Sequence, residues 1–216
     1  MADKFQLVLG THNQKKRREL SLLLAGLPIE VMTLDDIGNA LEVEETGSTF
    51  AENAALKATV QAQHLNAWVM GEDSGLSVDA LQGQPGVYSS RFAGAEATDQ
   101  DNNAKLVDML ASVPLDRRTA HYTCHMSLSD PSGIVVIDVE ETCRGRIVLE
   151  PRGDAGFGYD PYFELQEYHL TFAELGDTVK SVLSHRARAM RSFLREFSQL
   201  PQLRQTFSDT SHATAT

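Results

Sequence analysis

The sequence predicts an α/β protein in which a mixed β-sheet is flanked by helices. In the N-terminal half, short apolar strands alternate with segments of helical periodicity, the pattern of strands joined through helices. Past residue 118 the apolar period changes to two on both sides of a turn, which is typical of an antiparallel hairpin. A chain of 216 residues that combines both patterns favours a mixed sheet.

The first strand is predicted at residues 4–11, "KFQLVLGT", because the segment is short and apolar. A charged segment follows, in which Leu20, Leu23 and Leu24 recur at helical spacing. A second strand is predicted at residues 29–34, "IEVMTL". The N-terminal part of the chain is therefore expected to be strand, loop, helix and strand.

Two further helices are marked at their N-termini by a threonine followed three residues later by an acid, which is the spacing of a capping box. They are predicted at residues 49–65 and 99–112, and the apolar run at 67–71, "AWVMG", is a short buried strand between them. The Gly/Pro-rich stretch that follows this strand is expected to be a loop.

The long hairpin is predicted from residues 118–129 and 134–150, which are joined by the turn "DPSG". A final amphipathic helix is expected around residues 178–198. The small polar residues at the C-terminus predict a flexible tail over residues 201–216, which leaves residues 1–200 as a single domain.

Composition excludes several classes of protein. No apolar run approaches the roughly 20 residues needed to cross a bilayer, and the N-terminus lacks the features of a secretory signal, so we expect a cytoplasmic protein without membrane contact. The net charge of −11 argues against binding to nucleic acid, whose phosphates attract basic surfaces. The two cysteines, Cys124 and Cys143, have no CxxC spacing and are expected to be buried thiols.

The segment "GTHNQKKRREL" joins a strand to a helix, so its backbone N–H groups can hold phosphate oxygens at the positive end of the helix. Thr11 and Asn13 add side-chain donors, and Lys15 or Lys16 adds charge. The segment matches neither the Walker nor the GxGxxG pattern. A cationic, solvated helix face explains it equally well when it is taken alone.

Carboxylates and lysines recur in two later segments. "EVEETGSTFAENAALKA" supplies Glu44 and Glu45, and Asn53 and Lys57 lie four residues apart on one helix face. "GEDSGLSVDA" places two acids directly behind a buried strand, where a charge that loses hydration needs a partner or a chemical role. A solvated helix face and an acidic turn are the ordinary explanations, but acids suited to Mg²⁺ and lysines suited to phosphate in several segments favour a nucleotide site.

Two C-terminal segments are candidates for base recognition. "RGDAGFGYDPYF" has aromatic side chains among glycines, which can stack on a nucleobase while Asp160 reads its edge. "VKSVLSHRARAM" places Lys180, His185 and Arg186 near the start of the last helix, where Arg186 can donate to a base carbonyl. An aromatic loop that only pins itself and a helix with a basic stripe are the competing interpretations.

Taken in order, these segments resemble the inosine triphosphate pyrophosphatase family, enzymes that remove non-canonical purine nucleotides. The resemblance covers residues 5–197 through six blocks: "THNQKKRREL", "EETGSTFAENAALKA", "EDSGLSVDAL", "GQPGVYSSRFAG", "FGYDP" and "SHRARA". It implies an elongated mixed α/β fold whose two lobes enclose a central substrate cleft. It also implies a homodimer, a Mg²⁺ requirement, and hydrolysis of ITP, dITP or XTP to the monophosphate and pyrophosphate.

The resemblance also implies roles for individual residues. Asp73 would be the general base and a metal-associated carboxylate, and Glu44 or Glu45 would hold Mg²⁺, with Glu44 preferred. The remaining positions would bind the substrate: Thr11, His12, Asn13, Gln14, Lys15, Lys16 and Lys57 at the phosphates, Ser74 beside the base Asp73, and Phe157, Gly158, Tyr159, Asp160, Lys180, His185 and Arg186 around the purine.

Two positions depart from the commoner family pattern. His12 stands where glycine or asparagine is frequent, and Glu72 stands where aspartate often lies. Three other classes of protein fit the sequence less well. Septum-formation-inhibitor-like pyrophosphatases have a different opening loop, Nudix hydrolases carry an acidic helix that this chain lacks, and a nucleotide sensor without turnover would have no use for Asp73 and a second acidic segment.

Overall fold

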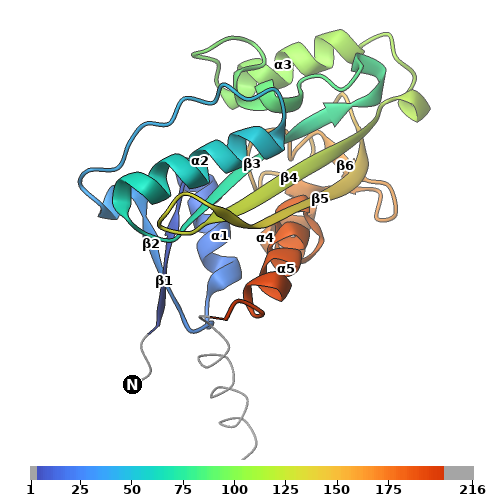
Figure 1. Cartoon of the computed structure of the whole chain (residues 1–216). Coiled ribbons are helices and arrows are strands. Elements are labelled where there is room, and N and C mark those ends of the chain that lie inside the picture. Colours follow the sequence, from blue (N-terminus) through green and yellow to red (C-terminus); the bar gives the residue numbers. More distant parts are fainter. Residues whose placement is uncertain (1–3, 202–216) are drawn as a thin grey trace, which may run out of the picture. The chain divides into compact units, whose positions relative to one another are not determined.

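The computed structural model describes residues 4–201 and contains one seven-stranded sheet with the strand order β2-β1-β3-β4-β5-β6-β7 (Figure 1). β1 pairs in parallel with both β2 and β3, whereas β5–β6 and β6–β7 are antiparallel, so the mixed α/β sheet is confirmed. The strands are β1 Phe5–Leu9, β2 Ile29–Thr33, β3 Val69–Val78, β4 Thr119–Ser129, β5 Val135–Ile147, β6 Phe163–Leu165 and β7 Leu170–Thr171.

Five α-helices lie within the described residues: α1 Gln14–Leu24, α2 Phe50–Leu65, α3 Asp99–Leu110, α4 Phe172–Leu183 and α5 His185–Phe197. The predicted N-terminal caps of α2 and α3 are confirmed. The side chain of Thr49 accepts from the backbone N–H of Glu52, and Thr98 forms a complete capping box with Asp101. The tail predicted at residues 201–216 lies outside the described part, apart from its first residue.

The described chain divides into two compact units. Unit 1 contains the residues up to Asp73, the hairpin segment His125–Glu140 and the residues from Ala189 onward. Unit 2 contains Ser74–Cys124 and Glu141–Arg188. The division falls inside β3, so that Asp73 and its neighbour in the chain, Ser74, belong to different units.

In unit 1, α2 covers one face of the sheet, while α1 and α5 lie against the opposite face (Figure 1). Apolar side chains of α2 and the strands form a core with Val8, Leu34, Ala62 and Val69. On the other face, the ring of Phe5 meets that of Phe197 edge to face, with 5.1 Å between their centroids. Because β3 is covered on both faces, charged side chains on it must find partners in the helices.

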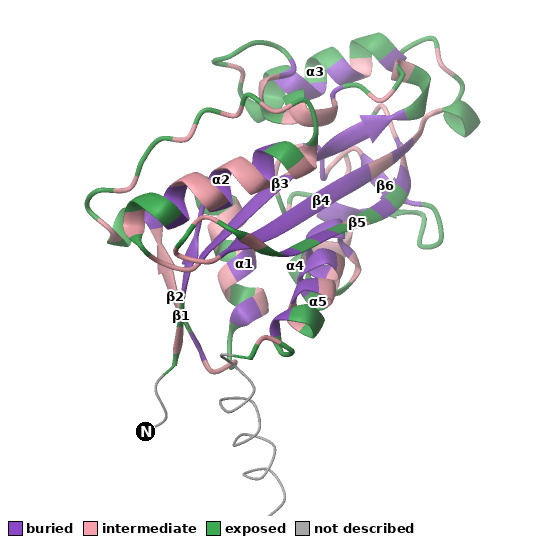
Figure 2. Cartoon of the chain, in the orientation of Figure 1, coloured by how far each residue is buried: buried purple, intermediate pink, exposed green. Residues whose placement is uncertain are grey.

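The core of unit 2 is aromatic. The ring of Tyr122 on β4 lies 4.6 Å from that of Phe163 on β6, and Phe163 stacks on Phe172 at the start of α4. Figure 2 shows β3 and β4 buried over most of their length, whereas much of α3 is exposed. The aromatic packing of Tyr122, Phe163 and Phe172 holds the loop between β5 and β6 against the rest of unit 2.

Two sequence predictions about elements were wrong. β3 does not end at residue 71 but continues to Val78, because its charged residues are paired with lysines on both faces of the sheet. The helix predicted at 178–198 is two helices, since Ser184 has an extended conformation (φ −66°, ψ 159°). The hydroxyl of Ser184 accepts from the N–H of Ala187 and thereby starts α5.

Two exclusions made from the sequence can be compared with the structure. Among the helices within residues 4–201, none is long and apolar enough to span a membrane. Cys124 and Cys143 are free and buried, as expected, and burial raises the pKa of the Cys143 thiol to about 11. The Cys143 thiol is therefore protonated and unreactive at neutral pH.

Candidate active site

The carboxylate of Asp73 lies at the centre of a polar cluster in unit 1. Asp73 is 5% exposed, and its Oδ1 accepts from Lys57 Nζ at 3.0 Å while its Oδ2 accepts from Asn53 Nδ2 at 3.2 Å. Both donors come from consecutive turns of α2, which follows from their spacing of four residues. Each carboxylate oxygen thus receives one donor and keeps the capacity to accept from a water molecule.

Burial is the main influence on the acidity of Asp73. It raises the pKa of the carboxyl above its ordinary value, because the charged form loses hydration. Lys57 and Lys16 act in the opposite direction, and the charge of Glu45 adds to the increase. A carboxylate with a raised pKa is a stronger base than an exposed one, which is the property needed to accept a proton from water.

The loop before α2 brings a second carboxylate to Lys57. Glu45 is half-buried, and its Oε1 lies 3.2 Å from Lys57 Nζ, so Lys57 joins Glu45 to Asp73. Glu44 is exposed, and its backbone carbonyl accepts from Thr46. Of the two candidate metal ligands, the structure brings Glu45 and not the preferred Glu44 into the cluster.

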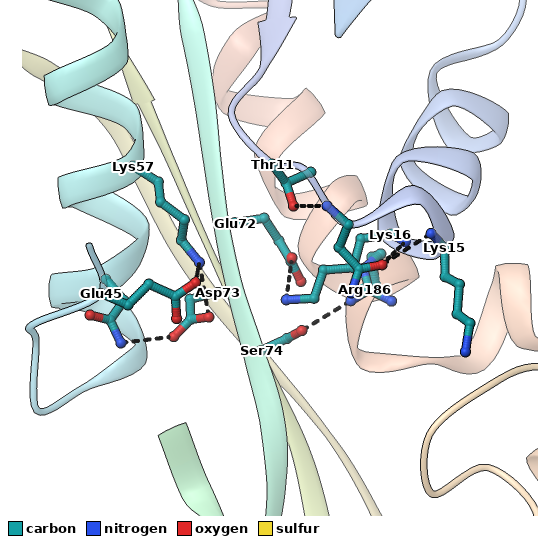
Figure 3. Close-up of polar contacts among 11 residues, drawn as sticks. Thr11, Lys15, Lys16, Glu45, Lys57, Glu72, Asp73, Ser74 and Arg186 are labelled. Carbon is teal, nitrogen blue, oxygen red and sulfur yellow. Dashed lines mark hydrogen bonds and ion pairs between the residues drawn. The ribbon is translucent and has the colours of Figure 1, made fainter. Parts of the chain in front are cut away.

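Glu72 and Asp73 are consecutive on β3 and therefore point to opposite faces of the sheet, as Figure 3 shows. Asp73 faces α2, whereas Glu72 faces α1 and pairs with Lys16, whose Nζ lies 3.0 Å from Glu72 Oε2. Glu72 is 1% exposed, so the charge of Lys16 offsets a burial that would otherwise be unfavourable. The two adjacent acids are therefore occupied by different lysines.

The predicted phosphate loop, residues 11–16, runs from the end of β1 into α1. The hydroxyl of Thr11 accepts from the N–H of Asn13, and the side-chain oxygen of Asn13 accepts from the N–H groups of Lys15 and Lys16. Asn13 is thus the N-cap of α1 rather than a side-chain donor aimed outward. Gln14 and Lys15 are exposed at the first turn of the helix.

His12 turns toward a different segment. Its ring lies 3.6 Å from the carboxylate of Asp35 and 3.4 Å from the carbonyl oxygen of Leu41, and Arg17 donates to the same carboxylate. These contacts tie the start of α1 to the segment that leads to Glu45. His12 is therefore engaged with this segment and not only with the loop in which it lies.

In unit 2, Ser74 is the only residue of β3 that is not classed as buried. The guanidinium of Arg186 donates to its hydroxyl at 3.0 Å (Figure 3). Arg186 is 2% exposed, and its neighbour His185 stacks on Tyr122 with 4.5 Å between the ring centroids and 10° between the planes. The first turn of α5 is thus fixed by one polar contact and one aromatic contact.

The loop predicted to bind the nucleobase, residues 157–160, is closed by a buried ion pair. Asp160 Oδ2 accepts from Lys180 Nζ at 2.5 Å and from the N–H of Phe157 at 2.8 Å. Lys180 Nζ lies 4.4 Å from the centroid of the Phe157 ring, a cation–π distance. A side chain at Gly156 would place its Cβ 2.2 Å from Asp160 Oδ2, so this turn requires glycine.

Two members of the predicted base set have structural roles. Tyr159 is buried in the core of unit 2, and its hydroxyl donates to the carbonyl of Ser89 at 2.8 Å. The backbone of Gly158 is held from α3, since its N–H donates to Asp99 and its carbonyl accepts from Asn103. Phe157 is half-buried, and Lys180 and Arg186 both lie over its ring.

The structure also shows contacts that sequence reasoning did not assign. Asn53 was placed on the same helix face as Lys57, but its bond to Asp73 spans 20 residues and no local pattern encodes it. The partner of Glu72, Lys16, lies 56 positions earlier in the chain. Consecutive side chains of a strand point to opposite faces of the sheet. A predicted strand that continued past residue 71 would therefore have placed Glu72 and Asp73 on different faces.

The acid cluster suits a hard cation that also binds phosphate. Among residues 4–201 no group of three His, Cys, Asp or Glu side chains is arranged to hold a metal ion. Glu45 and Asp73 do share Lys57, and Mg²⁺ typically takes one or two carboxylates and completes its shell with water and substrate phosphates. Two carboxylates of this kind fit Mg²⁺ better than Zn²⁺, which prefers His and Cys ligands.

Residues 7–196 match the model of the Ham1 family. A dITP/XTP pyrophosphatase of Rhodopirellula baltica is 54% identical over 202 residues, which cover 94% of this chain and 97% of that protein. A dITP/XTP pyrophosphatase of Bacillus cereus is 46% identical over 187 residues, which cover 86% of this chain and 91% of that protein.

Solved structures agree with the sequence match. The fold superposes on a HAM1 protein from Coxiella burnetii with a TM-score of 0.82 and 34% identity, covering 90% of this chain and 99% of that one. A nucleoside-triphosphatase / dITP/XTP pyrophosphatase from Mycobacterium abscessus gives a TM-score of 0.71 and 38% identity, covering 88% and 99%. With a family model spanning residues 7–196 and relatives of this identity and coverage, the chain belongs to the Ham1 family.

Proposed function

We propose that the chain hydrolyses non-canonical purine nucleoside triphosphates, namely dITP, ITP and XTP, to the monophosphate and pyrophosphate. Such an activity removes deaminated purines from the nucleotide pool before they enter DNA or RNA. The printed activity of the relatives, dITP/XTP pyrophosphatase, supports the reaction class. The observation that carries the proposal is the carboxylate of Asp73, which Lys57 and Asn53 hold by hydrogen bonds and whose pKa is raised by burial.

In the proposed reaction a water molecule attacks the α-phosphorus. Asp73 accepts a proton from this water as the new P–O bond forms, and the bond from the α-phosphorus to the bridging oxygen breaks. The electron pair of that bond leaves with pyrophosphate, whose developing charge requires cations. The raised pKa of Asp73 supports the base assignment, because it strengthens the carboxylate as a proton acceptor.

We assign the triphosphate to the polar set of unit 1. Lys57 lies beside Asp73, and the loop at residues 11–16 offers backbone N–H groups at the start of α1, where an anion is favoured. Lys16 brings a further positive charge that is oriented by Glu72. In this assignment Glu72 is not a second base but the group that holds Lys16.

Mg²⁺ would be held by Glu45 and Asp73 together with the phosphates, and when bound it would offset negative charge on the substrate. The contact of Glu45 with Lys57 supports Glu45 over Glu44 as the ligand. With Lys57 on both acids, a cation at this position requires Lys57 to turn toward the phosphates, which its long side chain permits.

We assign the purine to the set of unit 2. The half-buried ring of Phe157 would stack on the purine, and Arg186 and His185 would donate to a 6-keto oxygen. Adenine places an amino donor at that position, so it meets donors instead of acceptors and is disfavoured. Asp160 supports this set indirectly, because it holds both Lys180 and the backbone of Phe157.

A homodimer, a cytoplasmic location and a single domain over residues 1–200 stay predictions of the sequence. Light scattering coupled to gel filtration measures the first of these directly. A mass of twice 23.7 kDa is the expected result, and a mass of 23.7 kDa would contradict it.

The proposed function is tested by measuring products from a panel of nucleoside triphosphates. We expect release of pyrophosphate and the monophosphate from dITP, ITP and XTP, with ATP turned over at least tenfold more slowly. Omitting Mg²⁺ and adding a chelator is expected to abolish the reaction. Release of phosphate and IDP from ITP would contradict the bond assignment, and tight binding without any product would indicate a nucleotide sensor.

A further inference from the structure

Asn53 makes two contacts that connect separate parts of the polar cluster in unit 1. Its Oδ1 accepts from the backbone N–H of Gly47 at 2.8 Å, and its Nδ2 donates to Asp73 Oδ2 at 3.2 Å. Asn53 is fully buried on α2. One amide therefore joins the loop that carries Glu45 to the strand that carries the proposed base.

The chemistry of the two partners fixes which way the amide points. A backbone N–H can only donate, so the oxygen of Asn53 must face Gly47. The amide nitrogen is then left facing Asp73, where it can only donate to the carboxylate. A rotation of the amide by 180° would place a donor against a donor and an acceptor against a negative charge.

The loop approaches Asn53 too closely for any residue other than glycine. A Cβ at position 47 would lie 2.6 Å from Asn53 Oδ1 and 2.7 Å from the Cβ of Glu52, well inside van der Waals contact. The next residue, Ser48, is bound to the carboxylate of Glu52 at 2.6 Å. The segment that follows Glu45 is thus clamped to the first turn of α2 at two consecutive residues.

We propose that Asn53 is a positioning residue for the reaction: Gly47 fixes its amide, and the amide holds the carboxylate of Asp73 in one orientation beside Lys57. This inference rests on the proposed function, in which Asp73 is the base. With Lys57 on one oxygen and Asn53 on the other, the carboxylate cannot rotate, so the direction in which it accepts a proton is set before substrate binds.

The effect of losing the Asn53 amide depends on the charged groups around Asp73. The charged groups that act on it are Lys57 on α2, Lys16 on α1 and Glu45 on the loop. Asn53 is neutral, so its replacement by the similarly shaped leucine leaves all these charges in place. It removes only the hydrogen bond to Asp73 Oδ2, so that of the two donors Lys57 alone still holds the carboxylate.

The test compares Asn53→Leu with a matched control, Gln61→Met. Gln61 is also a fully buried amide on α2 that holds the same long loop, since its side chain bonds both the N–H and the carbonyl of Leu41, but no described contact joins it to Asp73. Both variants lose a loop tether, and both are expected to lower Tm. Only Asn53→Leu is expected to affect Asp73, the proposed general base.

For Asn53→Leu we expect kcat for ITP at pH 7 to fall on the order of tenfold or more, because the carboxylate of Asp73 is no longer held in one orientation. KM should change less than about threefold, since Asn53 makes no proposed contact with substrate. Gln61→Met should leave both kcat and KM close to those of the unmodified protein.

A second variant reaches the amide from the other side and guards against misfolding of the first. Gly47→Ala retains Asn53, Lys57 and Asp73 but pushes its new methyl group against Asn53 Oδ1. We expect a smaller fall in kcat, again with little change in KM. An unchanged kcat in this variant would overturn the role of Gly47 in fixing the amide.

An unchanged kcat in folded Asn53→Leu would overturn the inference. The proposed function fails in a different way. If Asp73→Asn keeps near-normal turnover, then Asp73 is not the base, whatever Asn53 does. If Asp73→Asn is inactive and Asn53→Leu has the kcat of the unmodified protein, only the inference about Asn53 is wrong.

Discussion

Each unit of the molecule contains one buried pair of aspartate and lysine, and the two pairs are used differently. Asp73 with Lys57 in unit 1 and Asp160 with Lys180 in unit 2 have similar exposures, between 2% and 7%. The Nζ to carboxylate distances are 3.0 Å and 2.5 Å. Pair geometry and burial therefore do not distinguish Asp73, the proposed base, from Asp160.

The remaining contacts do distinguish them. Asp160 directs one oxygen to both Lys180 and the backbone N–H of Phe157, so its charge is used to close its own loop. Asp73 receives its two donors on different oxygens and shares Lys57 with Glu45. A second negative charge near the same lysine weakens the pairing of Asp73 and favours a proton there. What a buried ion pair can do therefore depends on the other contacts of its aspartate and its lysine.

The largest expected effect is on kcat, which should depend strongly on Asp73 and much less on Asp160. Asp73→Asn should lower kcat for ITP by at least about 1000-fold, because an amide cannot accept the proton of water. Circular dichroism should show an unchanged fold. Pyrophosphate release measured at saturating ITP tests this expectation, and a loss of less than tenfold would contradict the assignment of Asp73.

Asp160→Asn should show the opposite balance, with a large loss of stability and a smaller loss of turnover. The substitution leaves Lys180 buried without its carboxylate, which typically costs about 3–5 kcal/mol in the free energy of unfolding. KM for ITP should rise roughly tenfold or more as the loop of Phe157 loosens, while kcat changes less. Urea unfolding and steady-state kinetics check both parts, and a stability equal to that of the unmodified protein would refute the structural role.

A smaller effect is expected at the ring that supports His185. Tyr122→Leu removes the face on which the imidazole stacks, an interaction of about 0.5–1.5 kcal/mol, so the preference for ITP over ATP should fall severalfold. Tyr122→Phe keeps the stack and should keep the preference. Equal specificity ratios in the two variants would mean that the stack does not orient His185.

The sequence could predict the elements because their signals are local. Threonine caps, the period of two in the hairpin and the turn "DPSG" each act within a few residues, and the structure confirms the strands and helices that they mark. The end of β3 was predicted wrongly for the opposite reason. Acids disfavour a strand locally, and only lysines from α1 and α2, distant in sequence, make them tolerable there.

The residue types of the candidate site were also predictable, but the contacts that their side chains make were not. Asp160 was expected to read a base edge, whereas its carboxylate accepts from Lys180 and from the backbone of its own loop. The break at Ser184 was hidden because apolar residues keep a helical spacing on both sides of it. Pairings over 16 or 20 residues depend on the packing of α2 on β3, and no sequence pattern encodes them.

The smallest expected effect has the opposite sign to that of Asp160→Asn and concerns the stability of Asp73→Asn. Burial raises the pKa of Asp73 in the folded protein above its unfolded value of 3.8, so the folded state binds the proton more tightly. The stabilisation linked to this proton is complete below the unfolded pKa and is lost as pH rises through the folded pKa. At pH 7 the ionised Asp73 therefore destabilises the fold relative to a neutral side chain.

Asparagine carries no charge to desolvate, and Lys57 keeps Glu45 as a partner. Asp73→Asn should consequently gain stability at pH 7 and unfold at a higher Tm than the unmodified protein. The gain should shrink as pH falls toward 3.8, since the carboxyl of the unmodified protein then becomes neutral too. Thermal unfolding of both proteins across this pH range measures the difference. A Tm below that of the unmodified protein at pH 7 would show that the ion pair with Lys57 outweighs desolvation, and the two buried pairs would then be alike in energy and differ only in position.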